Sequence, residues 1–91
     1  MKRFVVCDYY HENCEINIDA ICDTFENAFQ AMLKDINEML QSYAGTEDNA
    51  ECNIYADSAT MLVNGEILCD WQIRKADVSL TDSEKGEISV R

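Results

Sequence analysis

Residues 24–44 read TFENAFQAMLKDINEMLQSYA, and this stretch decides the fold because its apolar side chains recur every three or four positions. That spacing places the apolar side chains on one face of an α-helix and the polar side chains on the other. The expected apolar face consists of Phe25, Ala28, Phe29, Met32, Leu33, Ile36, Met39, Leu40 and Tyr43. The expected solvent face consists of Glu26, Asn27, Gln30, Lys34, Asp35, Asn37, Glu38, Gln41 and Ser42.

Both ends of this segment carry helix-terminating signals. Asp23 is the predicted N-cap, and Glu26 stands three residues later, in the capping-box position. Gly45 is placed to adopt the left-handed conformation in which many helices end. We therefore predict one long amphipathic helix from about Thr24 to Ala44, and its apolar face needs a sheet to cover it.

A β-hairpin is predicted around Asn64-Gly65, because a tight type I′ turn needs positive φ at both central residues. Its arms are residues 60–63 and a long strand that begins at Glu66. In that second arm, the alternation places Ile67, Cys69, Trp71 and Ile73 on one face. It places Glu66, Leu68, Asp70, Gln72 and Arg74 on the other face.

Further strands are predicted at residues 2–10, 15–19 and 51–57, where β-branched and aromatic residues alternate with polar ones. After Ala76 the pattern weakens, and it leaves open a last hairpin around residues 82–86 or a loosely ordered tail. The predicted class is α+β: an antiparallel sheet of about four to five strands with the helix packed on one face, in the order β-β-α-β-β-β. Residues 1–91 are expected to form a single domain.

The charge of the chain is strongly asymmetric. The formal net charge is −11, and no Lys or Arg occurs between Thr46 and Asp70. Six carboxylates in this interval are the predicted partner-binding residues, namely Glu47, Asp48, Glu51, Asp57, Glu66 and Asp70. Such a field attracts a protein with a basic surface and repels nucleic acid and anionic membranes, so we expect neither nucleic acid nor membrane as a direct partner.

Five cysteines with irregular spacing do not suggest a disulfide framework, and we expect reduced thiols and a cytoplasmic location. The local group most suggestive of soft metal ligands, or of a thiol with a nearby base, consists of Cys7, His11 and Cys14, with Cys22 downstream. Their spacing matches no standard zinc motif, and no orienting group or oxyanion-hole motif accompanies them. We therefore predict no catalytic residue, no metal site and no cofactor, and keep a small thiol or metal-binding domain as an alternative.

The short, acidic, proline-free chain has an early strand, one long helix, and a late Asn-Gly hairpin that leads into Asp70-Trp71-Gln72-Ile73. In size, charge and style it resembles small proteins encoded on phages and mobile elements, including anti-CRISPR proteins and DNA mimics. The resemblance implies a non-catalytic inhibitor that occupies a cationic nucleic-acid-binding surface, and it assigns no residue roles. Two other classes fit the same features: an immunity or antitoxin protein for a basic nuclease, and a structural module of a mobile element.

Overall fold

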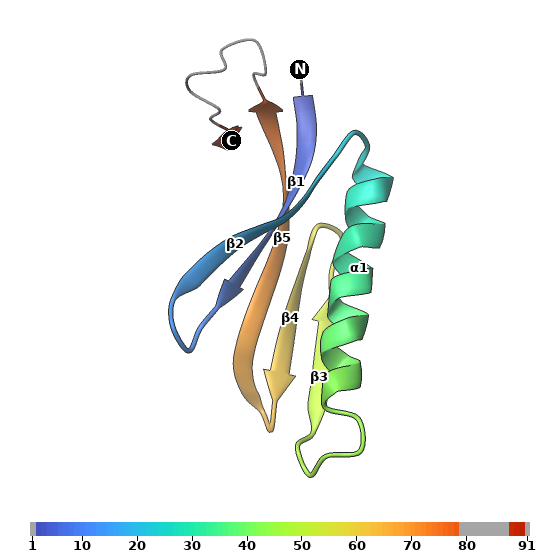
Figure 1. The fold of residues 1–91 in the computed structure, drawn as a ribbon, viewed down its shortest axis with the longest axis vertical. Coiled ribbons are helices and arrows are strands. Elements are labelled where there is room, and N and C mark those ends of the chain that lie inside the picture. The colour runs from blue at the N-terminus through green and yellow to red at the C-terminus, as the bar shows by residue number, and fades with distance from the viewer. Residues whose placement is uncertain (1, 79–87, 91) are drawn as a thin grey trace.

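The computed structural model describes residues 2–78 and 88–90. The elements in chain order are β1 (Lys2–Tyr10), β2 (Glu15–Cys22), α1 (Phe25–Ser42), β3 (Ala50–Ile54), β4 (Ser58–Val63), β5 (Glu66–Val78) and β6 (Ile88–Val90). The strands form one antiparallel sheet in the order β2-β1-β5-β4-β3, and β6 pairs with the C-terminal end of β5 (Figure 1). The predicted α+β class, with one helix against an antiparallel sheet, is therefore confirmed. The residues of the predicted last turn, 82–86, lie outside the described part of the chain.

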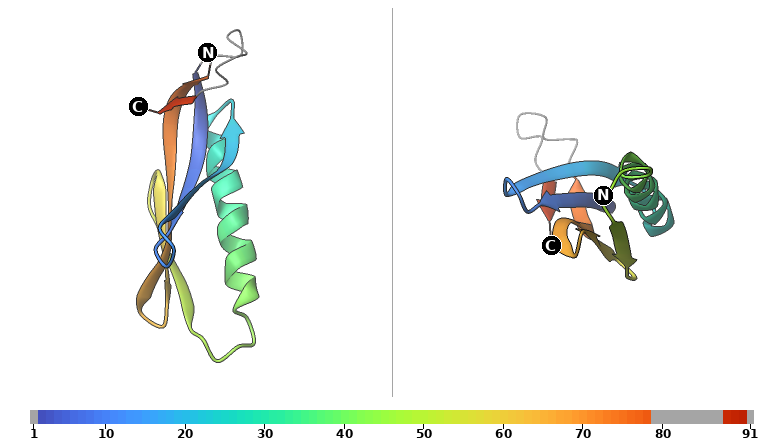
Figure 2. Two further views of the ribbon diagram at one scale, coloured as in Figure 1. Left: turned by 60° about the vertical axis from the view of Figure 1, so that its left-hand side comes forward. Right: turned by 90° about the horizontal axis from the view of Figure 1, so that it is seen from below.

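The helix lies along one face of the sheet (Figure 2). Its side chains Ala28, Met32 and Ile36, which are four residues apart, are buried. They pack against Val6 of β1, against Ala59 and Met61 of β4, and against Cys69, Trp71 and Ile73 of β5. No helix covers the opposite face in the part of the chain that the structure describes. The sheet therefore has a core face and a second face, called the open face below because no helix covers it, although Val5 and Ala76 on that face are also buried.

The helix begins one residue later than its predicted cap implies. Thr24 is the N-cap, and its Oγ1 accepts a hydrogen bond of 3.1 Å from the backbone N–H of Asn27. Asp23, the predicted cap, forms an ion pair with Arg3 instead. The helix ends at Ser42, two residues before the predicted end, while Gly45 adopts the expected left-handed conformation with φ of +79°.

The hairpin around Asn64-Gly65 is confirmed, because these residues have φ of +53° and +83°. One detail of the strand that follows was predicted wrongly. Met61 pairs with Cys69, but the next residue, Leu62, pairs with Ile67, so that Leu68 is an extra residue in β5. This β-bulge turns Ile67 away from the core, where it is 49% exposed, and lets Leu68 pack against the core instead.

A second bulge shapes β2, which reaches Cys22 rather than ending at Asp19 as predicted. Val6 of β1 pairs with Ala20, but Cys7 pairs with Ile18, so Asp19 is the extra residue. At the other edge of the sheet, β3 ends at Ile54 rather than reaching Asp57. The bulge at Asp19 matters for the sites described below, because it sets the direction of the side chains on either side of it.

Candidate functional site

The six predicted partner-binding carboxylates lie in different parts of the structure. Asp48 lies between α1 and β3, and its Oδ1 accepts a hydrogen bond of 2.9 Å from Nδ2 of Asn64 in the β4–β5 turn. Glu66, the first residue of β5, follows that turn directly, so it lies at the same end of the sheet as Asp48. Glu47 precedes Asp48, and Glu51 lies on β3 opposite Leu62. Glu47, Asp48, Glu51 and Glu66 are all exposed.

The other two predicted residues lie elsewhere. Asp57 is exposed in the β3–β4 turn at the far end of β4, where its carbonyl oxygen accepts a hydrogen bond of 2.8 Å from the N–H of Ile73. Asp70 is half-buried, and its carboxylate makes hydrogen bonds of 2.7 Å to Oγ1 of Thr60 and 2.5 Å to Nε2 of His11. Asp70 is thus already engaged within the protein, so it is a weaker candidate for a partner than the four exposed carboxylates.

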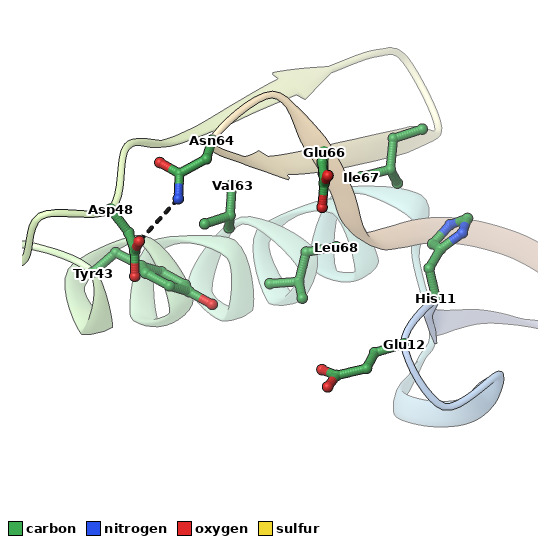
Figure 3. A pocket seen from close by; sticks show the side chains of 9 residues that line it. All are labelled: His11, Glu12, Tyr43, Asp48, Val63, Asn64, Glu66, Ile67 and Leu68. Atoms are coloured by element: carbon green, nitrogen blue, oxygen red, sulfur yellow. Dashed lines mark hydrogen bonds between the residues drawn. The ribbon is translucent and has the colours of Figure 1, made fainter.

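An open depression of about 790 Å³ lies at the end of the sheet that carries Asp48 and Glu66. Figure 3 shows His11 and Glu12 reaching it from the turn after β1, Tyr43 and Asp48 from the end of α1 and the segment beyond it, and Glu66 from β5. Its apolar floor comes from Val63, Ile67 and Leu68. Among the residues that the structure describes, three carboxylates and no Lys or Arg line this depression, which therefore favours a cationic group on a partner. Sequence analysis missed Glu12, because its place in the lining of this depression depends on how β1 pairs with β5.

A second acidic cluster was not predicted. The carboxylate oxygens of Asp8 (β1), Asp19 (the β2 bulge) and Asp35 (α1) lie within 4.8 Å of one another. Asp8 is 3% exposed, and its Oδ1 accepts a hydrogen bond of 3.0 Å from Nδ2 of Asn17. Asp35 Oδ2 accepts one of 2.7 Å from Nε1 of the buried Trp71.

The position of Asp35 corrects its assignment to the solvent face of the helix. A buried indole N–H needs an acceptor, and Asp35 is the residue of α1 that reaches Trp71. The only signal in the sequence was the presence of a core Trp, which requires an acceptor but does not say which one. The cluster itself joins residues from three elements, so no local pattern could predict it.

The cluster raises the pKa of one of its members. The pKa of Asp19 is raised to about 8, and burial is the largest cause. A hydrogen bond with Asp8 and the negative charges of Asp8 and Asp35 raise this pKa further. Burial is also the largest cause that raises the pKa of Tyr10 to about 12, followed by the Cys69 thiol and the same three carboxylates. Lys34 and Glu38 of α1 line the cavity next to Asp19 and Asp35. Because the pKa of Asp19 is raised to about 8, this carboxyl group holds its proton at neutral pH.

The stability of the protein is expected to fall as pH rises, because of Asp19. Its pKa is about 8 in the folded state against an ordinary value of 3.8, so this contribution is complete below pH 3.8 and is lost as pH rises through about 8. Because Asp19 keeps much of its exposure, solvent screening limits the loss to about 1–2 kcal/mol. Urea unfolding of the wild type and of Asp19→Asn on both sides of that range measures it. The variant should show a flatter profile, and two parallel profiles would contradict this prediction.

Cys7, His11 and Cys14, the alternative metal or thiol group, are not brought together as ligands. Within residues 2–78 and 88–90, only the Asp8, Asp19 and Asp35 group has ligand atoms close enough to hold one ion. His11 instead packs edge-on against Tyr9, with ring centroids 4.7 Å apart, and its Nε2 donates a hydrogen bond to Oδ2 of Asp70. Burial is the largest cause that raises the pKa of the Cys7 thiol, which disfavours the thiolate that a nucleophile or ligand needs.

Comparison with known proteins identified no relative of this chain. No protein-family model matches the chain, and no curated protein or solved structure is similar to it. In the part of the chain that the structure describes, no helix is both long and apolar enough to cross a membrane.

Proposed function

We propose that this protein is a non-catalytic, protein-binding module that inhibits a nucleic-acid-binding protein by occupying its cationic surface, as a DNA mimic does. The observation that carries this proposal is the acidic end of the sheet, where Glu12, Asp48 and Glu66 line one open depression. No Lys or Arg occurs between Thr46 and Asp70 to neutralise that end. The formal net charge of −11 extends the same field over the chain.

The geometry of this end suits a partner that normally holds phosphates. Hydrogen bonds from Asn64 Nδ2 to Asp48 Oδ1 and from the Asn49 N–H to Asn64 Oδ1 tie the segment after α1 to the β4–β5 turn. The carboxylates of Asp48 and Glu66 are therefore presented from backbone that is held in place, as charges on a nucleic acid are. The resemblance to small phage and mobile-element proteins favours an inhibitor, and free thiols suit a cytoplasmic one.

The test removes charge at the acidic end without changing shape. The variant Glu47→Gln/Glu51→Gln/Glu66→Gln replaces three exposed carboxylates, none of which makes a side-chain hydrogen bond within the described residues. Immobilised wild type should retain a basic protein from host lysate at low salt and release it at high salt or on addition of duplex DNA. The triple variant should retain about tenfold less of it at the same salt, since each lost contact is worth about 0.2–1 kcal/mol.

The matched control is Glu26→Gln/Glu38→Gln/Asp77→Asn, which removes the same number of charges from α1 and the other end of β5. It should bind as the wild type does. Equal losses in both triple variants would show that net charge alone matters. If DNA released nothing while a retained nuclease lost its activity, the immunity-protein alternative would replace the DNA-mimic proposal.

A further inference from the structure

Three isoleucines of β2 lie exposed on the open face of the sheet. Ile16 is 71%, Ile18 53% and Ile21 47% exposed. They pair with Tyr9, Cys7 and Val5 of β1, whose neighbour Val6 faces the helix, so all three lie on the face opposite α1. The bulge at Asp19 keeps Ile21 on that face despite its odd spacing from Ile18. A row of three large aliphatic side chains on one exposed strand is typical of an interaction site.

The strand that carries this row is also an edge of the sheet. β2 stands first in the order β2-β1-β5-β4-β3, and β1 is its only strand partner in the described residues. The outer backbone N–H and C=O groups of an edge strand can pair with a further strand. The bulge at Asp19 interrupts the C-terminal half of β2, whereas its N-terminal half, from Glu15 to Ile18, pairs regularly with β1. The N-terminal half of β2 therefore offers two exposed apolar side chains, Ile16 and Ile18, and a regular backbone edge that no other strand of the described residues pairs with.

Two kinds of strand could pair with this edge, namely β2 of a second copy of this chain or a strand of a basic protein, and the charges beside the edge favour the basic one. Glu15 is exposed on the strand and is oriented by a hydrogen bond of 2.9 Å from Nδ2 of Asn13, and Glu12 stands in the adjoining turn. A second copy would have to approach this edge against the repulsion between its own Glu12 and Glu15 and those of the first, which are exposed in both chains. Each copy also carries a net charge of −11. A strand with basic residues at the matching positions meets the opposite charge instead.

We infer that the β2 edge binds an extended segment of a basic protein in which aliphatic residues alternate with Lys or Arg. The aliphatic side chains of that segment pack beside Ile16 and Ile18 on the open face, and its cations lie beside Glu15 on the other face. Main-chain hydrogen bonds to Glu15–Ile18 extend the sheet by one strand. This surface differs from the acidic end in using the outer edge and the isoleucines of β2, although Glu12 in the β1–β2 turn lies next to both.

Binding of a synthetic peptide tests this inference. The probe is a fluorescein-labelled, end-blocked peptide of alternating lysine and valine, and the measurement is fluorescence anisotropy at low ionic strength. Wild type should bind it, and Ile16→Ser/Ile18→Ser should bind about tenfold more weakly because apolar burial is lost. Both side chains are mostly exposed, so the double variant should fold. The matched control is Ile54→Ser, which removes an isoleucine that is 46% exposed on the other edge strand, and it should bind as the wild type does.

Two further probes separate strand addition from simple charge attraction. The same peptide with N-methyl groups on alternate backbone amides keeps its charge but cannot complete the hydrogen-bonded ladder, and it should bind about tenfold more weakly. Equal binding of the two peptides would overturn the inference. So would a wild-type dimer in sedimentation that Ile16→Ser/Ile18→Ser abolishes, since the edge would then belong to a second copy. The Glu47→Gln/Glu51→Gln/Glu66→Gln variant should still bind the peptide, whichever way the test of the acidic end turns out.

Discussion

Replacing Trp71 with alanine is expected to destabilise the protein by about 3–5 kcal/mol, because it removes the largest fully buried side chain of the core. Trp71 is wholly buried between the helix and the sheet, and its Nε1 donates a hydrogen bond of 2.7 Å to Asp35. Alanine would leave a cavity and also remove the donor that Asp35 needs beside Asp8 and Asp19. Urea unfolding followed by circular dichroism measures the effect, since Trp71 is the only tryptophan and its fluorescence is lost.

The variant Trp71→Phe separates packing from hydrogen bonding. It keeps most of the ring but leaves Asp35 without its indole donor, and an unsatisfied group of this kind costs about 1–3 kcal/mol. Trp71→Phe should therefore fall between the wild type and Trp71→Ala. If Phe proved as stable as Trp, the hydrogen bond from Trp71 to the half-buried Asp35 would contribute nothing to stability.

The elements predicted from sequence are those whose signals are local. The turn at Asn64-Gly65 follows from two residues that tolerate positive φ, and the helix follows from the spacing of its apolar side chains. The ends of the helix were less well predicted, because Asp23 and Thr24 are adjacent residues that both suit an N-cap. Asp23 forms an ion pair with Arg3, which lies twenty residues earlier near the start of β1, and this leaves Thr24 as the N-cap.

The features that sequence analysis missed depend on pairing between distant segments. A bulge such as that at Leu68 or Asp19 is one extra residue relative to a partner strand, so it is visible only when the register is known. The same holds for the cluster of Asp8, Asp19 and Asp35, which come from three elements. Of the six predicted partner-binding carboxylates, Asp48 and Glu66 lie in one depression, and their role stays a prediction.

The second large effect is expected for Ile36 on the core side of α1. Ile36 is 2% exposed and packs between Met32 of its own helix and the sheet, so Ile36→Ala should cost about 2–5 kcal/mol. Gln30→Ala on the exposed side of the same helix removes a side chain of similar length and should change stability by less than about 0.5 kcal/mol. Leu33 is only half-buried, so Leu33→Ala should fall between them. Urea unfolding of the three variants gives the order, and equal effects of Ile36→Ala and Gln30→Ala would mean that α1 packs on the sheet through a different face.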